Sequence, residues 1–370
     1  METTSLQEML RSRDLPPFCG RQHAIATLLR EEYGILPEKA VTRTVSAPTV
    51  LDARLCAGQA ALSRVDVTLS SDLGAHTFPV YRLLHEDGKK HPFFVFLNIQ
   101  HGAPTLYFPV EEIADAGFDV LCVCYTDLSS DDGDFTNGLA GLFYDGPRGE
   151  HDAGKLMLWA YGASRILDMA AELPMLDLSR AAVMGHSRLG KTALLAGMLD
   201  ERFRFVFSND SGCSGAALSR GNLGQTGALG PYGKTGESIR YITETFPFWF
   251  APCYARFADT NAPEGFDQHH LLAAIAPRYA YVASADMDDW ADPDSEFLSC
   301  VAASVAWERL GLSGFVHSSR LPKTGEAYQV GHVGYHRRHG KHFLSRHDWA
   351  YYMSFIRLHE EDAPAPQPAL

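Results

Sequence analysis

Apolar stretches alternate with segments of helical pattern through most of this chain. Residues 65–69 and 76–84 alternate polar and apolar side chains on either side of a turn at 72–74, which predicts an antiparallel hairpin. Beyond residue 90 the predicted strands are apolar at nearly every position, which is typical of a parallel sheet covered by helices on both faces. We expect strands at 93–99, 119–125, 181–184, 203–208, 279–285 and 330–336, and helices at 110–116, 156–172, 191–199 and 296–310.

The two ends of the chain lack this alternation. Residues 1–45 carry a helical signal at 22–33 between Pro16-Pro17 and Pro37, which predicts a helical N-terminal extension. Residues 46–360 then form one α/β domain, and the Pro-rich residues 361–370 form a disordered tail. Residues 219–236, rich in Gly, Ser and Asn, are expected to form a long surface loop over the strand ends, where such sheets bind ligands.

Composition narrows the classes of function. The chain has 370 residues, is 46% hydrophobic and carries a net charge of -13, which argues against nucleic acid as a partner because phosphate binding needs a basic face. No apolar stretch approaches the length of a membrane span. The polar start of the chain lacks the pattern of a signal peptide, so we expect a cytoplasmic protein, or a secreted one if a leader has been trimmed.

The cysteines add little chemistry. Their number is odd, seven, and their spacing matches neither a metal site nor a disulfide framework, so we expect reduced and mostly buried thiols. We expect no metal and no cofactor. The sequence leaves the oligomeric state open.

The sequence Gly185-His186-Ser187-Arg188-Leu189-Gly190-Lys191 is the strongest candidate for chemistry. It places Ser187 where a buried strand turns into a helix, the position from which one class of hydrolases exposes its nucleophile. The usual second glycine of that turn is replaced by Leu189. Two cations, Arg188 and Lys191, flank the serine instead, which suits an anionic intermediate or substrate.

A serine nucleophile needs a histidine base, which in this architecture follows the last strand. His336, His339, His342 and His347 all lie there. His342 follows Gly340-Lys341 at the apex of the predicted loop and is the preferred base, whereas His336 is expected within the strand. A metal site formed by these histidines is disfavoured because they show no H-x-x-x-H pair on a helix.

Two loops offer the acid that orients the base. Asp210 directly follows one predicted strand, and Asp286, Asp288 and Asp289 follow the next, which is the more usual place for the acid of a hydrolase triad. Spacing alone does not choose between these loops.

Several blocks of sequence, taken in order, resemble the glucuronoyl esterases of carbohydrate esterase family 15. The family pattern G-C-S-R-x-G-K resembles residues 185–191, and E-S-G-x-G-G-A-A resembles Asp210-Ser211-Gly212-Cys213-Ser214-Gly215-Ala216-Ala217. The likeness continues through residues 242–244, 249–250, 267–278 and 289–290. The resemblance implies an α/β-hydrolase fold, with Ser187 as nucleophile, Arg188 at the oxyanion, Asp210 as catalytic acid and His342 as base. It also implies that Lys191, Glu244 and Trp290 contact the sugar.

The chain departs from the family pattern at two of these positions. His186 replaces a cysteine that fungal members tie into a disulfide, and Asp210 replaces a glutamate, which shortens its reach and leaves Asp288 as the alternative acid. The resemblance implies a serine esterase that cleaves uronic acid esters of carbohydrates, and a cytoplasmic member is expected to act on imported oligosaccharide esters. The alternatives are an acetyl esterase acting on acetylated xylan oligosaccharides and a non-catalytic binding protein of the same fold.

Overall fold

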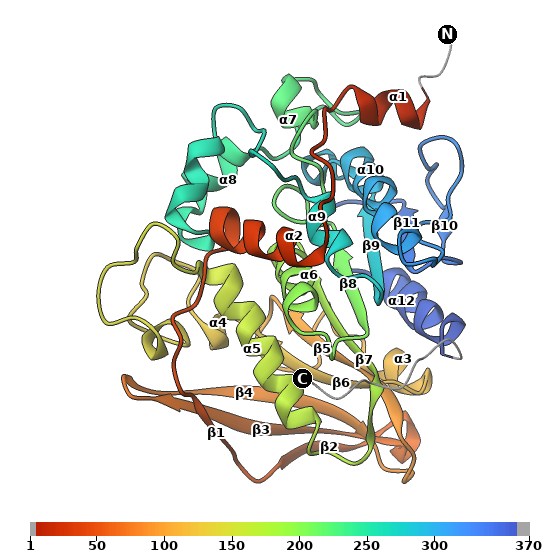
Figure 1. Ribbon diagram of the computed structural model, residues 1–370. Helices are drawn as coiled ribbons and strands as arrows, with labels where there is room; N and C mark the ends of the chain where they lie inside the picture. The colour runs from red at the N-terminus through yellow and green to blue at the C-terminus, as the bar shows by residue number, and fades with distance from the viewer. Residues whose placement is uncertain (1–4, 361–370) are drawn as a thin grey trace.

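The computed structural model describes residues 5–360, and its centre is an eleven-stranded sheet (Figure 1). The strand order is β1-β3-β4-β6-β5-β7-β8-β9-β11-β10, with β2 also paired to β3. The strands are β1 (Thr42–Val45), β2 (Thr49–Leu55), β3 (Ala60–Ser71), β4 (Gly74–His85), β5 (His91–Asn98), β6 (Asp119–Cys124), β7 (Leu176–His186), β8 (Phe205–Asn209), β9 (Tyr279–Ala285), β10 (Ala327–Tyr328) and β11 (Val333–Arg338).

The six strands from β6 to β11 in this order, β6-β5-β7-β8-β9-β11, run parallel to one another. Helices cover both faces of this block, as the apolar pattern predicts. The predicted hairpin is β3–β4, which pairs antiparallel from Ala60 opposite His85 to Ser71 opposite Gly74. The carboxyl ends of the parallel strands therefore meet along one edge of the sheet, where loops after β7, β8, β9 and β11 can converge.

Two apolar cores lie on the two faces of the sheet. One includes residues of α2, α5, α6, α9 and α10, and the other includes residues of α3 and α12. No described helix is long and apolar enough to cross a bilayer. The helices are α1 (Leu6–Arg11), α2 (Arg21–Leu28), α3 (Val110–Asp115), α4 (Tyr125–Leu128), α5 (Lys155–Ala170), α6 (Arg188–Leu199), α7 (Leu223–Thr226), α8 (Ile239–Thr245), α9 (His269–Ala273), α10 (Pro293–Ala303), α11 (Val305–Glu308) and α12 (Arg346–Leu358), with short helical turns at η1 (Leu29–Tyr33), η2 (Cys56–Gly58), η3 (Ala140–Leu142), η4 (Pro247–Trp249), η5 (Pro252–Phe257) and η6 (Asp289–Ala291).

Several elements differ from the predicted ones. The helix expected at 296–310 is divided into α10 and α11, and the loop expected at 219–236 contains the short α7. The unpredicted β1 begins at Thr42, so the chain joins the sheet before residue 46. The strands β1 and β2 are mostly exposed and pair only through β3, so their sequences carry little apolar signal. The predicted tail at 361–370 lies outside the described residues.

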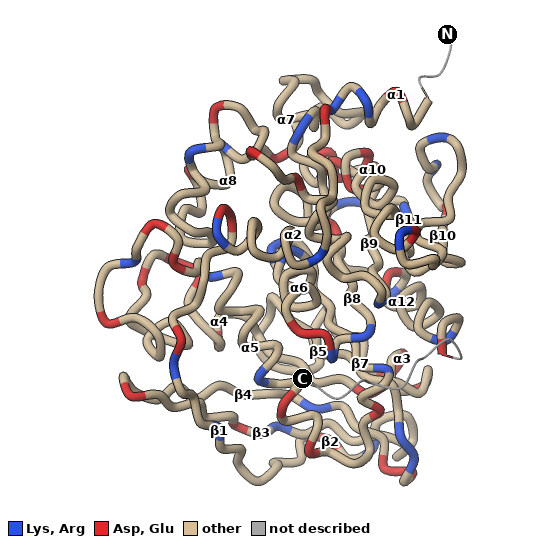
Figure 2. The backbone as a smooth tube through the Cα atoms, viewed as in Figure 1, with Lys and Arg blue, Asp and Glu red and all other residues tan. Residues whose placement is uncertain are grey.

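Charged residues of both signs are interspersed along the chain in the view of Figure 2. All seven cysteines are free, and five of them are buried.

Buried histidines on α9 connect the N-terminal segment to the domain. The ring of His269 hydrogen-bonds the carbonyl of Pro16 at 3.1 Å, and His270 packs edge-on against Phe18 at a centroid distance of 5.8 Å. Burial lowers the pKa of His269 to about 4 and that of His270 to about 3. Both ring nitrogens of His270 are buried without a hydrogen-bond partner.

Acid is therefore expected to destabilise the protein through these rings. Below about pH 6.5 a histidine in the unfolded chain binds a proton, whereas His269 and His270 in the folded protein stay neutral. The free energy of unfolding therefore falls by up to about 1.4 kcal/mol per pH unit for each ring. This stability is present above pH 6.5 and is lost as the pH falls toward 4. Urea unfolding between pH 7.5 and 4.5 should show a shallower loss in His270→Phe, whereas the control His347→Gln, at an exposed position, keeps the wild-type dependence. An unchanged slope in His270→Phe would contradict this account.

Candidate active site

Ser187 occupies a sharp turn between β7 and α6. Its backbone has φ 60° and ψ -128°, a conformation that L residues rarely adopt, and its N–H donates to the carbonyl of Asn209 at 2.8 Å. A Cβ atom at position 185 would collide with the backbone carbonyl of Leu189, so only glycine fits there. Gly185 thus allows the close approach of strand and helix, and Leu189 is accommodated as a fully buried core residue.

A continuous hydrogen-bond chain leads from Ser187 through His342 to Asp288. The hydroxyl of Ser187 lies 2.9 Å from Nε2 of His342, and Nδ1 of His342 lies 2.6 Å from a carboxylate oxygen of Asp288. The three side chains come from the ends of β7, β11 and β9, at one edge of the sheet. A hydroxyl that donates to an imidazole oriented by a carboxylate is the arrangement that activates a serine nucleophile.

The other three candidate histidines lie elsewhere. His336 is inside β11, as predicted, and its buried ring hydrogen-bonds Asp348 at 2.8 Å. His339 is exposed and pairs with Asp286 at 3.1 Å. His347 is exposed on the first turn of α12. Among these four residues, the contact to Ser187 is made by His342.

Asp210 lies beside the triad without hydrogen-bonding its histidine. Its Oδ1 accepts the backbone N–H of Ala285 at 2.6 Å, and its Oδ2 pairs with Arg338 at 3.2 Å. Burial, followed by the charge of Asp288, raises the pKa of Asp210 well above its ordinary value, although Arg338 opposes this rise. The acid expected from the resemblance is therefore close to His342, but Asp288, the alternative acid, makes the hydrogen bond. Asp210 carries one methylene fewer than glutamate, and both of its oxygens are already engaged.

Arg338 joins Asp210 to the loop that carries His342. Its guanidinium donates to both oxygens of Asp348 at 2.9 Å and also to the carbonyls of Lys341 and Phe343, the residues on either side of His342. A buried arginine with these partners holds the backbone of the histidine loop against α12 and Asp210. Sequence reasoning missed Arg338, because nothing in the motif distinguishes it from other arginines.

We expect Arg338→Met to lower kcat by about tenfold to a hundredfold with little change in KM, since a displaced base misaligns the triad without touching substrate. The protein should also lose about 3–5 kcal/mol of stability, because two carboxylates are left buried without their counter-ion. Steady-state kinetics well below the melting temperature, with thermal unfolding alongside, test both effects. Arg337→Met is the matched control, because Arg337 pairs with the half-exposed Asp294. Equal kcat losses in the two variants would exclude a positioning role.

The ring of His186 packs against the ring of the catalytic histidine, His342. Their ring centroids are 4.4 Å apart, and Nδ1 of His186 lies 2.6 Å from Oδ1 of Asn209. Burial, with a smaller effect of His342, lowers the pKa of His186 to about 3. The residue that replaces the family cysteine is thus an uncharged ring packed against His342.

Arg188 is held at the mouth of the site by an acid and by the rings of Tyr125, Phe246 and Trp249. Its guanidinium pairs with Asp131 and lies 4.8 Å from the ring centroid of Trp249, whose indole N–H also donates to Asp131 at 2.6 Å. Phe246 stacks on Trp249 at a centroid distance of 4.0 Å. As the first residue of α6, Arg188 has a backbone N–H without an intrahelical partner, available to an oxyanion. Asp131 was not predicted, because it lies in a loop with several other acidic and polar residues.

The predicted sugar contacts are only partly brought together. A cavity of about 240 Å³ is lined by Ser187, Arg188, Lys191, Trp290 and His342, together with Glu237 and Tyr241. Lys191 is 3% exposed and donates to the carbonyls of Ser211 and Cys213 and to Glu237 at 2.8 Å, so its ammonium is fully engaged. Trp290 packs edge-on against Tyr241 at 4.6 Å.

Glu244 does not line this cavity. Its side chain is 65% exposed on α8 and faces Arg240, one helical turn earlier, at 3.4 Å. Glu237 occupies the place expected of Glu244, immediately before α8, and is 8% exposed. The structure therefore does not bring Glu244 to this cavity, because the start of α8 at Ile239 turns position 244 outward.

Three groups in the site have the donor atoms of a metal ligand set. Ligand atoms of Asp210, Asp288 and His342 lie within 4.8 Å of one another. Each group already has a partner: Asp210 pairs with Arg338, Asp288 bonds His342, and His342 bonds Ser187. A cation would have to displace hydrogen bonds that the triad needs.

Comparison with known proteins links this arrangement to one group. A family model described as "Glucuronyl esterase, fungi" matches residues 67–311. The carbohydrate esterase MZ0003 of an unknown prokaryotic organism is 33% identical over 71% of this chain and 58% of its own length. A 4-O-methyl-glucuronoyl methylesterase of Podospora anserina is 30% identical over 80% of this chain and 58% of its own length. The chain spans about half the length of the curated relatives it matches.

Solved structures extend the likeness to the whole fold. A glucuronoyl esterase from Solibacter usitatus superimposes with a TM-score of 0.81 at 29% identity, covering 93% of this chain and 97% of that one. A promiscuous CE15 esterase from a marine bacterial metagenome gives a TM-score of 0.79 at 27% identity, covering 92% and 91%. The predicted α/β-hydrolase fold is confirmed.

Proposed function

Because the chain belongs to the glucuronyl esterase family, we propose that it is a serine esterase that hydrolyses uronic acid esters of carbohydrates. The observation that carries the proposal is the hydrogen-bonded chain Ser187–His342–Asp288, which opens into the same cavity as Arg188 and Trp290. Relatives named 4-O-methyl-glucuronoyl methylesterase support the choice of ester.

In this mechanism Ser187 attacks the ester carbonyl of the uronate while Nε2 of His342 takes the hydroxyl proton. Asp288 accepts the Nδ1–H of His342 and stabilises the imidazolium. The backbone N–H and guanidinium of Arg188 stabilise the tetrahedral oxyanion. His342 then gives its proton to the leaving alcohol, and a water molecule, deprotonated by His342, hydrolyses the acyl-enzyme to the free carboxylate.

The polar wall opposite Arg188 suits a sugar ring. One carboxylate oxygen of Glu237 accepts a hydrogen bond from Lys191. No described residue hydrogen-bonds the other oxygen, which can accept from a sugar hydroxyl. Lys191 acts through Glu237, since all three of its N–H donors have acceptors. Trp290 and Tyr241 add aromatic surface beside this carboxylate, and carbohydrate rings pack well on such surface.

The deciding measurement is hydrolysis of benzyl glucuronate beside an acetylated xylose of similar size. We expect kcat/KM to favour the glucuronate, and Glu237→Gln to raise KM for that substrate by about tenfold, the value of one charge-assisted hydrogen bond. Glu244→Gln, at the exposed position, should leave both parameters unchanged. Activity on the acetyl ester alone would favour the acetyl esterase and refute the proposal.

A further inference from the structure

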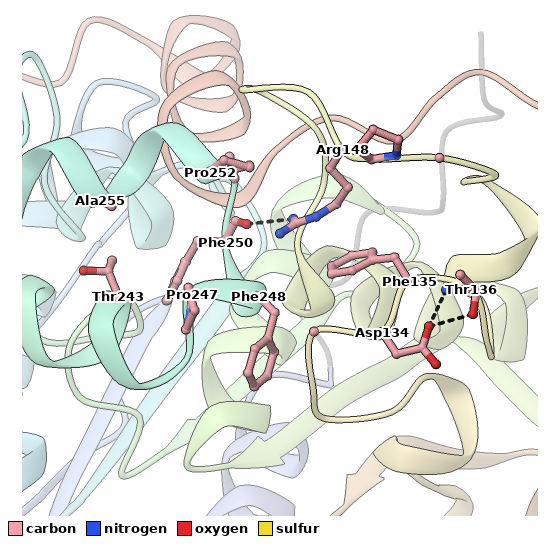
Figure 3. Close-up of a pocket in the computed structure, with 14 residues that line it drawn as sticks. Asp134, Phe135, Thr136, Arg148, Thr243, Pro247, Phe248, Phe250, Pro252 and Ala255 are labelled. Atoms are coloured by element: carbon pink, nitrogen blue, oxygen red, sulfur yellow. Dashed lines mark hydrogen bonds between the residues drawn. The ribbon is translucent and has the colours of Figure 1, made fainter.

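A second cavity lies on the other side of the segment that walls the catalytic pocket. Phe246 and Trp249 line the catalytic pocket, whereas Pro247, Phe248 and Phe250 line the second cavity, which has a volume of about 560 Å³. Figure 3 shows its two walls, with Phe135 and Arg148 on one and this segment on the other. A volume of this size falls within the range of small-molecule sites.

Arg148 brings a positive charge to this cavity. Its Nη1 donates to the carbonyls of Ala153 at 3.1 Å and Phe250 at 3.0 Å, and its guanidinium lies 3.9 Å from the centroid of the Phe135 ring. Among the described residues no carboxylate pairs with Arg148, and its Nε and Nη2 have no hydrogen-bond partner. The side chain is thus fixed in place by two backbone bonds while part of its planar donor edge stays available.

Three other charged side chains lie near Arg148: Asp134, Lys155 and Asp152, the last of which accepts from the backbone N–H of Gly149. Asp134, the acid of the lining, already accepts from the N–H and hydroxyl of Thr136 and from the amide of Asn137. Lys155, 4.6 Å from the Phe135 ring, donates to two serine hydroxyls and to the carbonyl of Asp134. The charges of Asp134 and Lys155 are opposite in sign and both side chains are engaged in hydrogen bonds, whereas Arg148 keeps donor atoms without a partner. These donors can bind an anion, and a planar guanidinium matches a carboxylate.

The remaining lining selects the body of the ligand. Apolar side chains are the largest group in the lining and include Phe135, Phe248, Phe250, Pro147, Pro247 and Pro252. Phe248 is the most exposed of the three phenylalanines. The hydroxyl of Thr243 donates to the carbonyl of Ile239, and the hydroxyl of Thr136 donates to the carboxylate of Asp134. A sugar would bury its hydroxyls here without partners, whereas a flat apolar ring would not.

We propose that this cavity binds an aromatic monocarboxylate of the benzoate or cinnamate type, with its carboxylate on Arg148 and its ring against the phenylalanines. The ligand lies outside the catalytic pocket and shares only the wall at residues 246–250 with it. This binding does not depend on the esterase activity proposed above.

Isothermal titration of the whole protein with sodium cinnamate tests the proposal. We expect saturable binding that Arg148→Met weakens tenfold or more, because it removes the charge-assisted bonds. The control Arg240→Met, at an exposed arginine paired with Asp259 and Glu244, should leave the affinity unchanged. Ester hydrolysis by Arg148→Met should also stay at the wild-type rate, which separates a failure of this proposal from a failure of the esterase assignment.

A second variant keeps the test decisive if Arg148→Met perturbs its loop. Ala255 lies at the exposed rim of the cavity, so Ala255→Trp fills the space and leaves the bonds of Arg148 intact. It should also weaken cinnamate binding tenfold or more. Acetate, which lacks the ring, and cinnamyl alcohol, which lacks the charge, should bind at least tenfold more weakly than cinnamate. No binding of cinnamate, wild-type affinity in both variants, or binding of either analogue as tight as that of cinnamate would overturn the proposal.

Discussion

Replacing Ser187 with alanine is expected to abolish ester hydrolysis and leave the fold intact. The hydroxyl is the atom hydrogen-bonded to His342, and loss of the serine from a triad of this kind costs on the order of a millionfold in kcat. Alanine needs no more room than serine, and the unusual φ of 60° is strained equally for both residues, so stability should change by less than about 1 kcal/mol. Hydrolysis of benzyl glucuronate and thermal unfolding measure the two effects.

Ser179→Ala is a suitable control for this variant. Ser179 lies on the same strand, β7, toward its other end, where its hydroxyl bonds Asp177. Its replacement should leave kcat unchanged. If Ser187→Ala retained more than about a hundredth of the wild-type rate, another nucleophile would have to be sought.

Asp288→Asn is expected to lower kcat about a thousandfold or more, because an amide at this position no longer holds the Nδ1–H tautomer of His342. Asp210→Asn should cost less, about tenfold to a hundredfold. Asp210 makes no hydrogen bond to the histidine, and Arg338, which links it to the histidine loop, keeps its two bonds to Asp348 and its bonds to the loop carbonyls in this variant.

The comparison of these two isosteric variants decides which acid orients the base. Both should be assayed at a temperature at which thermal unfolding finds them fully folded, since each perturbs a buried carboxylate. A greater loss in Asp210→Asn than in Asp288→Asn would assign the orienting role to Asp210. In that case the observed hydrogen bond between Asp288 and His342 would not be the catalytic one.

Local sequence was sufficient for the scaffold. The apolar runs at 93–99, 119–125 and 181–184 have no polar face, which is typical of strands covered on both sides, and they lie in β5, β6 and β7. The turn at Ser187 could also be predicted from the sequence, because its strand, glycine and helix are consecutive in the chain. Sequence patterns did not predict short or exposed elements such as β1 and β2, because their pairing depends on β3 rather than on their own pattern.

The sequence by itself determined the fold class, the position of Ser187 and a short set of partners for it, since each of these follows from neighbouring residues. Only the tertiary structure decided among those partners. Asp288 rather than Asp210 reaches His342, and Glu237 rather than Glu244 faces Lys191. These choices depend on how separate loops approach one another within a few ångströms, a distance set by the packing of the whole sheet.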